Sequence, residues 1–423
     1  VRIDRHFYGI QPLTKTRPQH IPLYQFPIVD DSIHIGELPL TQLVRRIGKT
    51  PFYAYDRKKI SEIIALLRQH LPADVHLHYA MKANPMPAVV QHLAGLVDGL
   101  DVASVAEMHV ALDTTMPADQ ISFAGPGKND SALASAIAAG ITINLESEQE
   151  MENVAGLGKQ LDLQPNVAIR VNPDFELKAS GMKMGGGAQQ FGVDAERVPA
   201  MLSSLQKLNL NFLGFHIFSG SQNLKAASIQ EAHEKTLQLA MRLAEQTSLP
   251  IRSLNIGGGF GIPYFPGDNH LDLKAIGENL EQLLPQVKRK LPTAEIVIEL
   301  GRFMVAEAGI YVCRILERKC SREKIFLVTD GGLHHHLAAS GNFGQVVRKN
   351  YPVVIGNKVE GGEREVVSVV GPLCTPLDLM ANQMEMAKAN VGDYVVVLQS
   401  GAYGLTASPT SFLSHPAPLE VLV

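Results

Sequence analysis

The feature that most restricts the fold is an alternation of short apolar runs with helix-length amphipathic stretches, which begins after residue 70 and repeats eight times. The runs read VHLHYAMK, LDVAS, ISFAG, ITINLE, VAIRVNP, LGFHIFSG, SLNIGGG and IVIELGR. Between them, segments such as MPAVVQHLAGLV carry apolar residues at every third or fourth position, as on one face of a helix. Eight strand–helix units in about 230 residues predict an α/β fold of the (β/α)8 barrel type, with a doubly wound open sheet as the competing fold.

The sequence pattern changes from Tyr311 onward, where strand-like runs such as REVVSVVGP and DYVVVLQSGAYG are separated by turns and few helical patterns occur. A chain of 423 residues is too long for one ordinary core, so a second domain is expected. We predict a C-terminal β domain, barrel or sandwich, with which the early stretch IVDDSIHIG pairs. The expected divisions are 1–50 for an N-terminal segment, 51–305 for the barrel and 306–423 for the β domain.

Charge and composition exclude several kinds of partner. A net charge of −4 and a pI near 6.4 give no footprint for nucleic acid or an anionic membrane, so small molecules are the expected partners. No stretch approaches the roughly 18 apolar residues of a spanning helix, and VRIDRHFY lacks the layout of a secretion signal. A sparse, odd set of cysteines suits a reducing cytoplasm: Cys313, Cys320 and Cys374.

Polar residues or glycine stand at the end of nearly every predicted strand. Taken singly, each is explained by the chain returning to water. Taken together, they are aimed at one point, because a barrel collects the carboxyl ends of its strands on one rim. The candidate residues are Lys82, Asp101, Ser104, Gly125, Glu146, Arg170, His216, Ser219, Gly257 to Gly259, Glu299 and Arg302.

Lys82 is the most informative of these residues. A lysine fixed at a strand end is expected to be partly desolvated, which lowers the pKa of its amine and makes it a nucleophile for carbonyls; the alternative is a surface lysine. The turn NIGGGFG after the seventh strand suits backbone amides that approach a phosphate, although glycine turns also occur for steric reasons. Together they predict a phosphorylated carbonyl cofactor on the lysine, pyridoxal 5'-phosphate.

These motifs carry a resemblance to a known family. In order, YAMKAN, DVAS, AGPGK, FHIFSGSQ, NIGGGFG, ELGR, GPLCTPLD and SGAYG span about 75 to 410. The chain resembles the fold-type III pyridoxal-phosphate decarboxylases, whose members act on ornithine, diaminopimelate or arginine. Within that family, blocks such as DGGLHHHLAASGNFGQVVRKNYP look like decarboxylases encoded beside exosortase systems. They are also similar to the decarboxylase of glutamate carried on an acyl-carrier protein.

The resemblance implies the roles of the cofactor residues. Lys82 would form the Schiff base, and Glu299 would keep the pyridine nitrogen protonated so that the ring stabilises the carbanion. His216 would stack on the ring; alone, it would read as a core histidine. Asp101, Glu107 and Arg170 would support the lysine and the ring. The remaining cofactor contacts would come from Ser219, Gly257, Gly258, Gly259, Gly301, Arg302 and Tyr403.

Cys374 matches the family cysteine that protonates the intermediate from across a dimer interface, so a homodimer with shared active sites is expected. The alternative is an inert thiol. Substrate contacts are expected from Arg302, Arg348, Cys374, Asp378 and Tyr403. Asp378 would suit the distal ammonium of a diamino acid, whereas Arg348 would suit a diacid or a carrier-linked substrate. An acyl-carrier protein is therefore a candidate partner.

Three departures from the family pattern bear on the substrate. Thr375 stands where diaminopimelate decarboxylases have a glutamate, the triplet 334–336 (HHH) replaces their Asn-Asp, and Leu300 replaces a proline. Diaminopimelate is therefore a less expected substrate. The triplet lacks partners at ligand spacing, so no metal is expected. The segment 181–192 (GMKMGGGAQQFG) is expected to be either a lid that excludes water during chemistry or a loop that is ordered only in the dimer.

We therefore expect a decarboxylase of an amino acid or a carrier-linked aminoacyl group. The alternatives are a diaminopimelate decarboxylase, a racemase of the same barrel type, and a catalytically silent homologue that binds a partner protein. The retention of Lys82, His216, Glu299 and Cys374 argues against the silent homologue, since such a chain has no chemical reason to keep the set.

Overall fold

The computed structural model describes residues 20, 22 and 25–423, apart from 177–181, 184 and 346. Its larger part is a closed barrel of parallel strands in which all eight predicted runs take part. Closure comes from the pairing of the fourth strand with the fifth and of the last strand with the first, which rules out the open sheet. The strands are β5 (Val75–Ala80), β6 (Gly99–Val102), β7 (Ile121–Phe123), β8 (Thr142–Leu145), β9 (Asn166–Asn172), β12 (Asn211–Ile217), β14 (Ser253–Gly258) and β15 (Glu295–Leu300).

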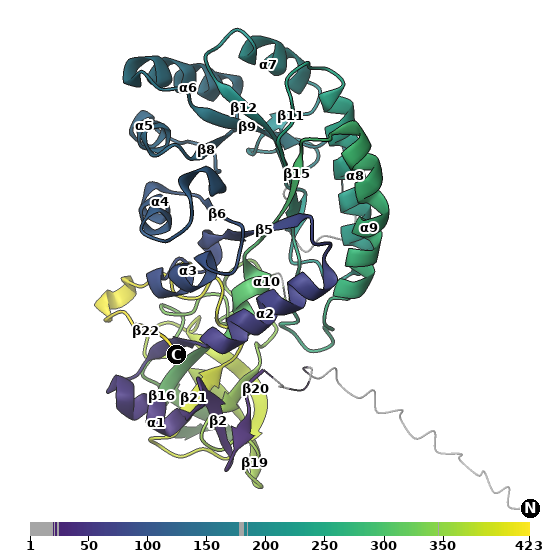
Figure 1. Ribbon diagram of the computed structural model, residues 1–423. Helices are drawn as coiled ribbons and strands as arrows, with labels where there is room; N and C mark the ends of the chain where they lie inside the picture. The colour runs from purple at the N-terminus through teal and green to yellow at the C-terminus, as the bar shows by residue number, and fades with distance from the viewer. Residues whose placement is uncertain (1–19, 21, 23–24, 177–181, 184, 346) are drawn as a thin grey trace, which may run out of the picture.

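Helices surround the strands as an outer ring, which is plain in Figure 1. Their starts follow the strand ends closely because capping side chains stand there: Ser104, Asn129 and Ser147 each accept a hydrogen bond from an amide in the first helical turn. The helices are α2 (Arg57–His70), α3 (Pro87–Ala94), α4 (Val105–Leu112), α5 (Asp130–Ala139), α6 (Glu148–Leu161), α7 (Val198–Leu205), α8 (Ala226–Ala244) and α9 (Leu273–Lys290).

The predicted second domain is also present, as an eight-stranded sheet beside the barrel (Figure 1). The strand β16 is long enough to pair with β4 and β21 along its first half and with β17 along its second half. In pairing order the path runs through β18 (Val353–Ile355), β21 (Tyr394–Val397), β16 (Gly309–Ser321), β17 (Lys324–Thr329), β19 (Arg364–Val370) and β20 (Leu379–Ala387), with β4 (Phe52–Tyr55) joining β16 to β22 (Leu419–Leu422).

The strand β4 shows where the chain passes from one domain to the other. The sequence assigned residues 52–55 to the barrel, whereas the structure pairs them with β16 and β22 of the β domain. All four side chains are buried, because Tyr53 and Tyr55 join the core that continues into the barrel while Phe52 and Ala54 join a second core. A short strand buried on both faces carries no periodicity that distinguishes its sheet.

The early strands form a small antiparallel sheet of their own: β1 (Ile28–Val29), β2 (Ser32–Ile35) and β3 (Leu38–Pro39), followed by α1 (Leu40–Ile47). The predicted pairing of this stretch with the β domain is limited, among the described residues, to two backbone hydrogen bonds: the Ile33 amide donates to the carbonyl of Gly356, and the Val359 amide donates to the carbonyl of Asp31. Asp31 Oδ1 also accepts from the amide of Glu360 at 2.5 Å, and Ile33, Ile35 and Leu40 share a core with Ile310 and Val396. Among the described residues, no helix is both long and apolar enough to cross a bilayer.

Candidate active site

Three strands of the barrel bring together a lysine, a glutamate and a histidine. Lys82 stands in the turn Met81–Ala83 (η1) directly after β5, and Glu299 lies on the neighbouring strand β15. The Lys82 Nζ atom is 3.9 Å from Glu299 Oε1, and His216 Nε2, from β12, is 3.0 Å from Glu299 Oε2. Glu299 and His216 are buried, whereas the Lys82 side chain is 44% exposed. An incoming carbonyl can therefore reach the amine.

The charge state of this group differs from the sequence-based expectation. Burial acts to lower the pKa of Lys82, but the Glu299 carboxylate, with Tyr403 and Asp101, outweighs burial and raises that pKa. The expected lowering is therefore wrong. Burial likewise acts to raise the pKa of Glu299, but the His216 contact and the Lys82 charge hold it well below its ordinary value. The site presents an ammonium against an ionised carboxylate.

The glycine turn is dictated by close backbone contacts. Gly257 and Gly259 have φ angles of 73° and 77°, and a Cβ on Gly258 would collide with the carbonyl oxygen of Glu299. A Cβ on Gly257 would lie 3.0 Å from the carbonyl oxygen of Ile217, at the end of β12. The Gly257 amide donates to Asn255 Oδ1 at 2.8 Å. This amide is therefore hydrogen-bonded within the protein, whereas the sequence predicted that it would bind the phosphate.

Arg302 and Tyr403 close around the lysine turn. Arg302 Nη1 donates to Tyr264 OH at 3.0 Å, and the Arg302 guanidinium carbon lies 4.6 Å from the centre of the Tyr403 ring. The Tyr403 amide donates to the carbonyl of Ala83 at 2.8 Å. Gly301 permits this packing, because a Cβ there would lie 2.9 Å from the Ala83 Cβ. The two segments fix the turn that carries the lysine.

Arg170 and Asp101, both predicted to support the cofactor, are held by buried networks. Arg170 Nη1 donates to Glu146 Oε1 at 2.8 Å, and its guanidinium covers the Phe191 ring at 4.8 Å. Asp101 Oδ1 accepts from Ser122 Oγ at 2.6 Å and lies 3.2 Å from His78 Nδ1. Glu107 accepts from the amide of Ala103 at 2.7 Å, an interaction that fixes the start of α4.

The segment 181–192 is described in part, because 181 and 184 lie outside the described residues. Its strand β10 (Met182–Lys183) pairs with β13 (Gly220–Ser221), which directly follows Ser219. The amide of Gly192 at the other end donates to Glu146 Oε2 at 2.7 Å. The segment thus lies along the active rim, and its role as a lid stays a prediction.

The loop of residues 371–378, here called the cysteine loop, carries Cys374 on the surface. Asp378 in the same loop is 3% exposed, and its two carboxylate oxygens accept from the amides of Leu333 and Leu373 at 2.6 and 2.8 Å. Arg348 donates to the carbonyls of Ser340 and Leu379. Both charges expected to face the substrate are thus bonded to backbone.

The histidine triplet is buried beside these groups. His335 lies 3.0 Å from Tyr311 OH and 2.9 Å from the Pro416 carbonyl, and His336 lies 3.0 Å from Ser400 Oγ. The ring nitrogens of His334 have no hydrogen-bond partner among the described residues. Burial lowers the pKa of His334 and His336 to about 3 and that of His335 to about 4, so all three are neutral near pH 7. No group of metal-ligating side chains is found in the described part of the chain.

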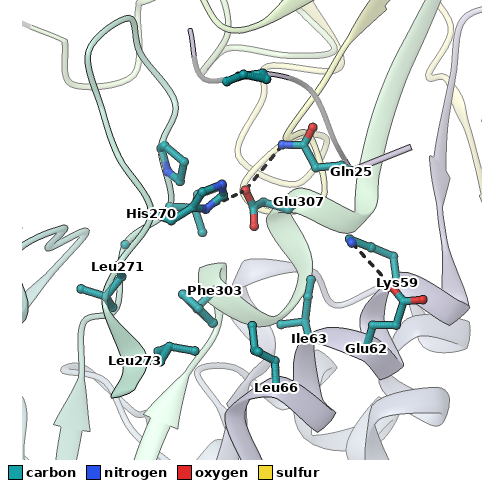
Figure 2. Close-up of a pocket in the computed structure, with 14 residues that line it drawn as sticks. Gln25, Lys59, Glu62, Ile63, Leu66, His270, Leu271, Leu273, Phe303 and Glu307 are labelled. Atoms are coloured by element: carbon teal, nitrogen blue, oxygen red, sulfur yellow. Dashed lines mark hydrogen bonds and ion pairs between the residues drawn. The ribbon is translucent and has the colours of Figure 1, made fainter. Parts of the chain in front are cut away.

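A separate pocket of about 440 Å³ lies between α2 and the segment that follows the glycine turn. Figure 2 shows an apolar wall that includes Ile63, Leu66 and Phe303, and a polar side where Gln25 and His270 approach the Glu307 carboxylate. It contains none of the residues predicted for the active site.

Sequence reasoning missed His78, Ser122 and Tyr264, which contact predicted site residues. The alternation of the first strand gave a usable signal, because His78 and Tyr79 point to opposite faces of β5 and His78 lines the barrel cavity with Asp101. Tyr264 lies in an irregular segment after the glycine turn, where no periodicity places a side chain.

The residues present fit a phosphorylated aldehyde. An accessible lysine amine stands beside a buried, ionised carboxylate, and a tight glycine turn lies on the next strand. Arg302 Nε and His216 Nδ1 are buried without a partner among the described residues, which leaves two polar atoms for a bound group. This combination on a barrel rim defines the class: a pyridoxal-phosphate enzyme with a covalently bound cofactor.

The comparisons identify the family. Residues 57–306 match "Pyridoxal-dependent decarboxylase, pyridoxal binding domain", and the chain belongs to this family. It is 36% identical to the L-glutamyl-[BtrI acyl-carrier protein] decarboxylase of Niallia circulans over 92% of each chain. It is 32% identical to the diaminopimelate decarboxylase of Aquifex aeolicus, over 93% of this chain and 91% of that one.

Solved structures agree with this placement. The diaminopimelate decarboxylase of M. jannaschii superposes with a TM-score of 0.86 at 25% identity, covering 95% of this chain and 93% of that chain. A mutant SrLDC in complex with PLP gives 0.77 at 25% identity, covering 92% and 96%. The protein is a pyridoxal-phosphate-dependent decarboxylase of fold type III.

Proposed function

We propose that this decarboxylase acts on an amino acid whose far end is electrically neutral, such as a glutamyl group linked to an acyl-carrier protein. The observation that carries the proposal is that backbone groups already bind both charged side chains that were expected to contact the substrate. Asp378 accepts from two amides, and Arg348 donates to two carbonyls. The neighbouring histidines are neutral at pH 7. The resemblance to a carrier-linked glutamyl decarboxylase supports the same substrate class.

The proposed division of labour follows from the site. Bound pyridoxal phosphate supplies an electron sink for the negative charge left when carbon dioxide departs. Lys82 holds the cofactor and yields to the substrate's amine. Glu299, kept ionised by His216 and Lys82, holds a proton at the pyridine nitrogen.

Cofactor binding is proposed to use the remaining predicted residues. The His216 side chain contacts the ring, and Arg302 uses its guanidinium for the phosphate with Ser219, Tyr403 and the amides of the glycine turn. Arg170 and Asp101 fix the surroundings of the lysine. Gly257 contributes through its conformation, since its amide is bonded to Asn255.

Protonation after decarboxylation is assigned to a second subunit. Cys374 is exposed, and Leu377 in the same loop is 58% exposed, which suits a loop covered by another copy of the chain. We propose a homodimer in which Cys374 of the partner subunit delivers a proton to the substrate carbon. Under this scheme neither subunit is active alone.

The test is carbon dioxide release by the purified protein with pyridoxal phosphate. The panel holds carrier-linked glutamate, L-glutamine and L-glutamate, with lysine and diaminopimelate as cationic competitors. Release is expected to be fastest from the carrier-linked neutral substrate. Faster release from diaminopimelate would instead support the diaminopimelate decarboxylase, and loss of optical activity without carbon dioxide would support the racemase.

A further inference from the structure

His78 is a buried histidine beneath the active rim that the proposed mechanism does not use. It lies on β5, its Nδ1 is 3.2 Å from Asp101 Oδ1 on β6, and its Cα is in register with Glu299 on β15. A glycine at position 99 makes room for the ring, since a Cβ there would collide with His78 Nε2. The His78 ring is therefore held on β5, between strand β6, which carries Asp101, and strand β15, which carries Glu299.

Asp101 links His78 to a chain of hydrogen bonds across neighbouring strands. Ser122 Oγ donates to Asp101 Oδ1 at 2.6 Å, and Asn144 Nδ2 donates to Ser122 Oγ at 3.1 Å. The second oxygen of Asp101, Oδ2, is buried and has no hydrogen-bond partner among the described residues. A buried carboxylate with a single satisfied oxygen needs a nearby cation to remain charged.

The barrel axis gives this pair access to water. A cavity of about 620 Å³ is lined by His78 and Asp101, by His216 and Asn255 toward the active rim, and by further polar residues toward the opposite end: Asn166, Asn211, Arg252 and Glu295. The interior of such a barrel is normally filled with side chains, so a polar cavity of this size is a departure that admits water.

We propose that His78 is a positioning residue that carries a proton at neutral pH and balances the charge of Asp101 beneath Lys82 and Glu299, exchanging that proton with water in the barrel cavity. The charged groups that face it are acidic: Asp101 on β6, Glu299 on β15 and Asp98 just before β6. Burial acts to lower the pKa of His78, but these carboxylates outweigh burial and raise it above 6.5.

The proposal has a direct consequence for Lys82. With His78 protonated, two carboxylates face two cations, Lys82 and His78. Without that charge, Asp101 and Glu299 both act on the lysine and raise the pKa of its nitrogen. This consequence rests on the proposed role of Lys82, whereas the charge of His78 does not.

The first test uses the protein without cofactor. Histidine ring signals are followed by NMR from pH 5 to 9, and the His78 signal is assigned by its loss in His78→Gln or, if that variant does not fold, in His78→Asn. A proton carried at neutral pH requires a wild-type pKa above 7, and this pKa is expected to fall by about one unit in Asp101→Asn. A pKa at or below 7, or one unmoved by Asp101→Asn, overturns the proposal even if the enzyme is active.

The second test uses the protein loaded with pyridoxal phosphate. The pH midpoint of the cofactor's visible absorption band is expected to rise by about 0.5 to 1 unit in His78→Gln and to fall by a similar amount in Asp101→Asn. His233→Gln, which removes another buried histidine, is the matched control and should leave the midpoint unchanged. Equal shifts in His78→Gln and the control would reduce His78 to a packing residue. An absent band would contradict the proposed function of Lys82 and leave the NMR result standing.

Discussion

Replacing Asp378 by asparagine distinguishes between two roles for this residue, which are to hold two loops together and to bind the substrate. The carboxylate accepts two amide hydrogen bonds, from Leu333 on one loop and Leu373 on the other. Asparagine keeps one acceptor and turns an NH2 donor toward the other amide. A hydrogen bond to a charged group contributes about 1.5 to 3 kcal/mol, so a loss of about 2 kcal/mol in the free energy of unfolding is expected.

The assay is thermal unfolding monitored by circular dichroism. At roughly 2 to 4 °C per kcal/mol, the melting temperature is expected to fall by about 4 to 8 °C. Glu360→Gln, which neutralises an exposed acid of the same domain, should change it by less than about 1 °C. Asp378→Asn is also expected to leave the relative rates on lysine and carrier-linked glutamate unchanged. An unchanged melting temperature with a selective loss of activity on lysine would refute the reasoning and return Asp378 to the substrate pocket.

Three further predictions address the cofactor turn, the buried ion pair and the dimer. Gly258→Ala should weaken cofactor affinity by more than tenfold, because the added Cβ would collide with the carbonyl oxygen of Glu299 on β15. The control Gly362→Ala, whose added Cβ meets open space, should leave the affinity unchanged. Both affinities are measured by titration with the cofactor, followed by fluorescence. Burial acts to raise the pKa of Glu146, but the Arg170 guanidinium outweighs burial and lowers that pKa. The ion pair therefore stabilises the fold fully above pH 4.5, and this stabilisation is lost as the pH falls through the lowered pKa. Glu146→Gln should flatten the melting-temperature profile in that pH range. Mixing inactive Lys82→Ala and Cys374→Ala subunits should restore about one quarter of wild-type activity, because random pairing makes half of the dimers heterodimers and each heterodimer has one intact site of two. If mass spectrometry shows that the subunits exchange and no activity returns, the active sites are not shared.

The sequence was sufficient for features that depend on local patterns. The eight barrel strands were predictable because each is a short apolar run followed by a helix-length amphipathic segment, and the lysine followed from its place at the end of the first. The β domain was predictable from its texture. The strand at 52–55 was not, because its four buried residues show no alternation that selects one sheet. The domain limits stay a prediction.

Features that depend on partners distant in sequence were out of reach. The pKa of Lys82 was expected to fall, and it rises because Glu299 stands beside it after the barrel closes. The charges of Asp378 and Arg348 suggested contacts with substrate, whereas folding brings backbone amides and carbonyls to both. A sequence shows that a charge exists and gives no sign of which group it meets.

The attachment of the cofactor to Lys82 is the claim on which the proposed mechanism depends most. Protein loaded with pyridoxal phosphate, beside the Lys82→Ala variant, is reduced with borohydride, digested and mapped by mass spectrometry. The structure predicts a covalent pyridoxyl group on Lys82 of the wild type and none on the variant, because this amine is exposed to the rim while Lys128 is buried in an ion pair with Glu150. Label on a different lysine, or equal label in both proteins, would contradict the assignment of the active site.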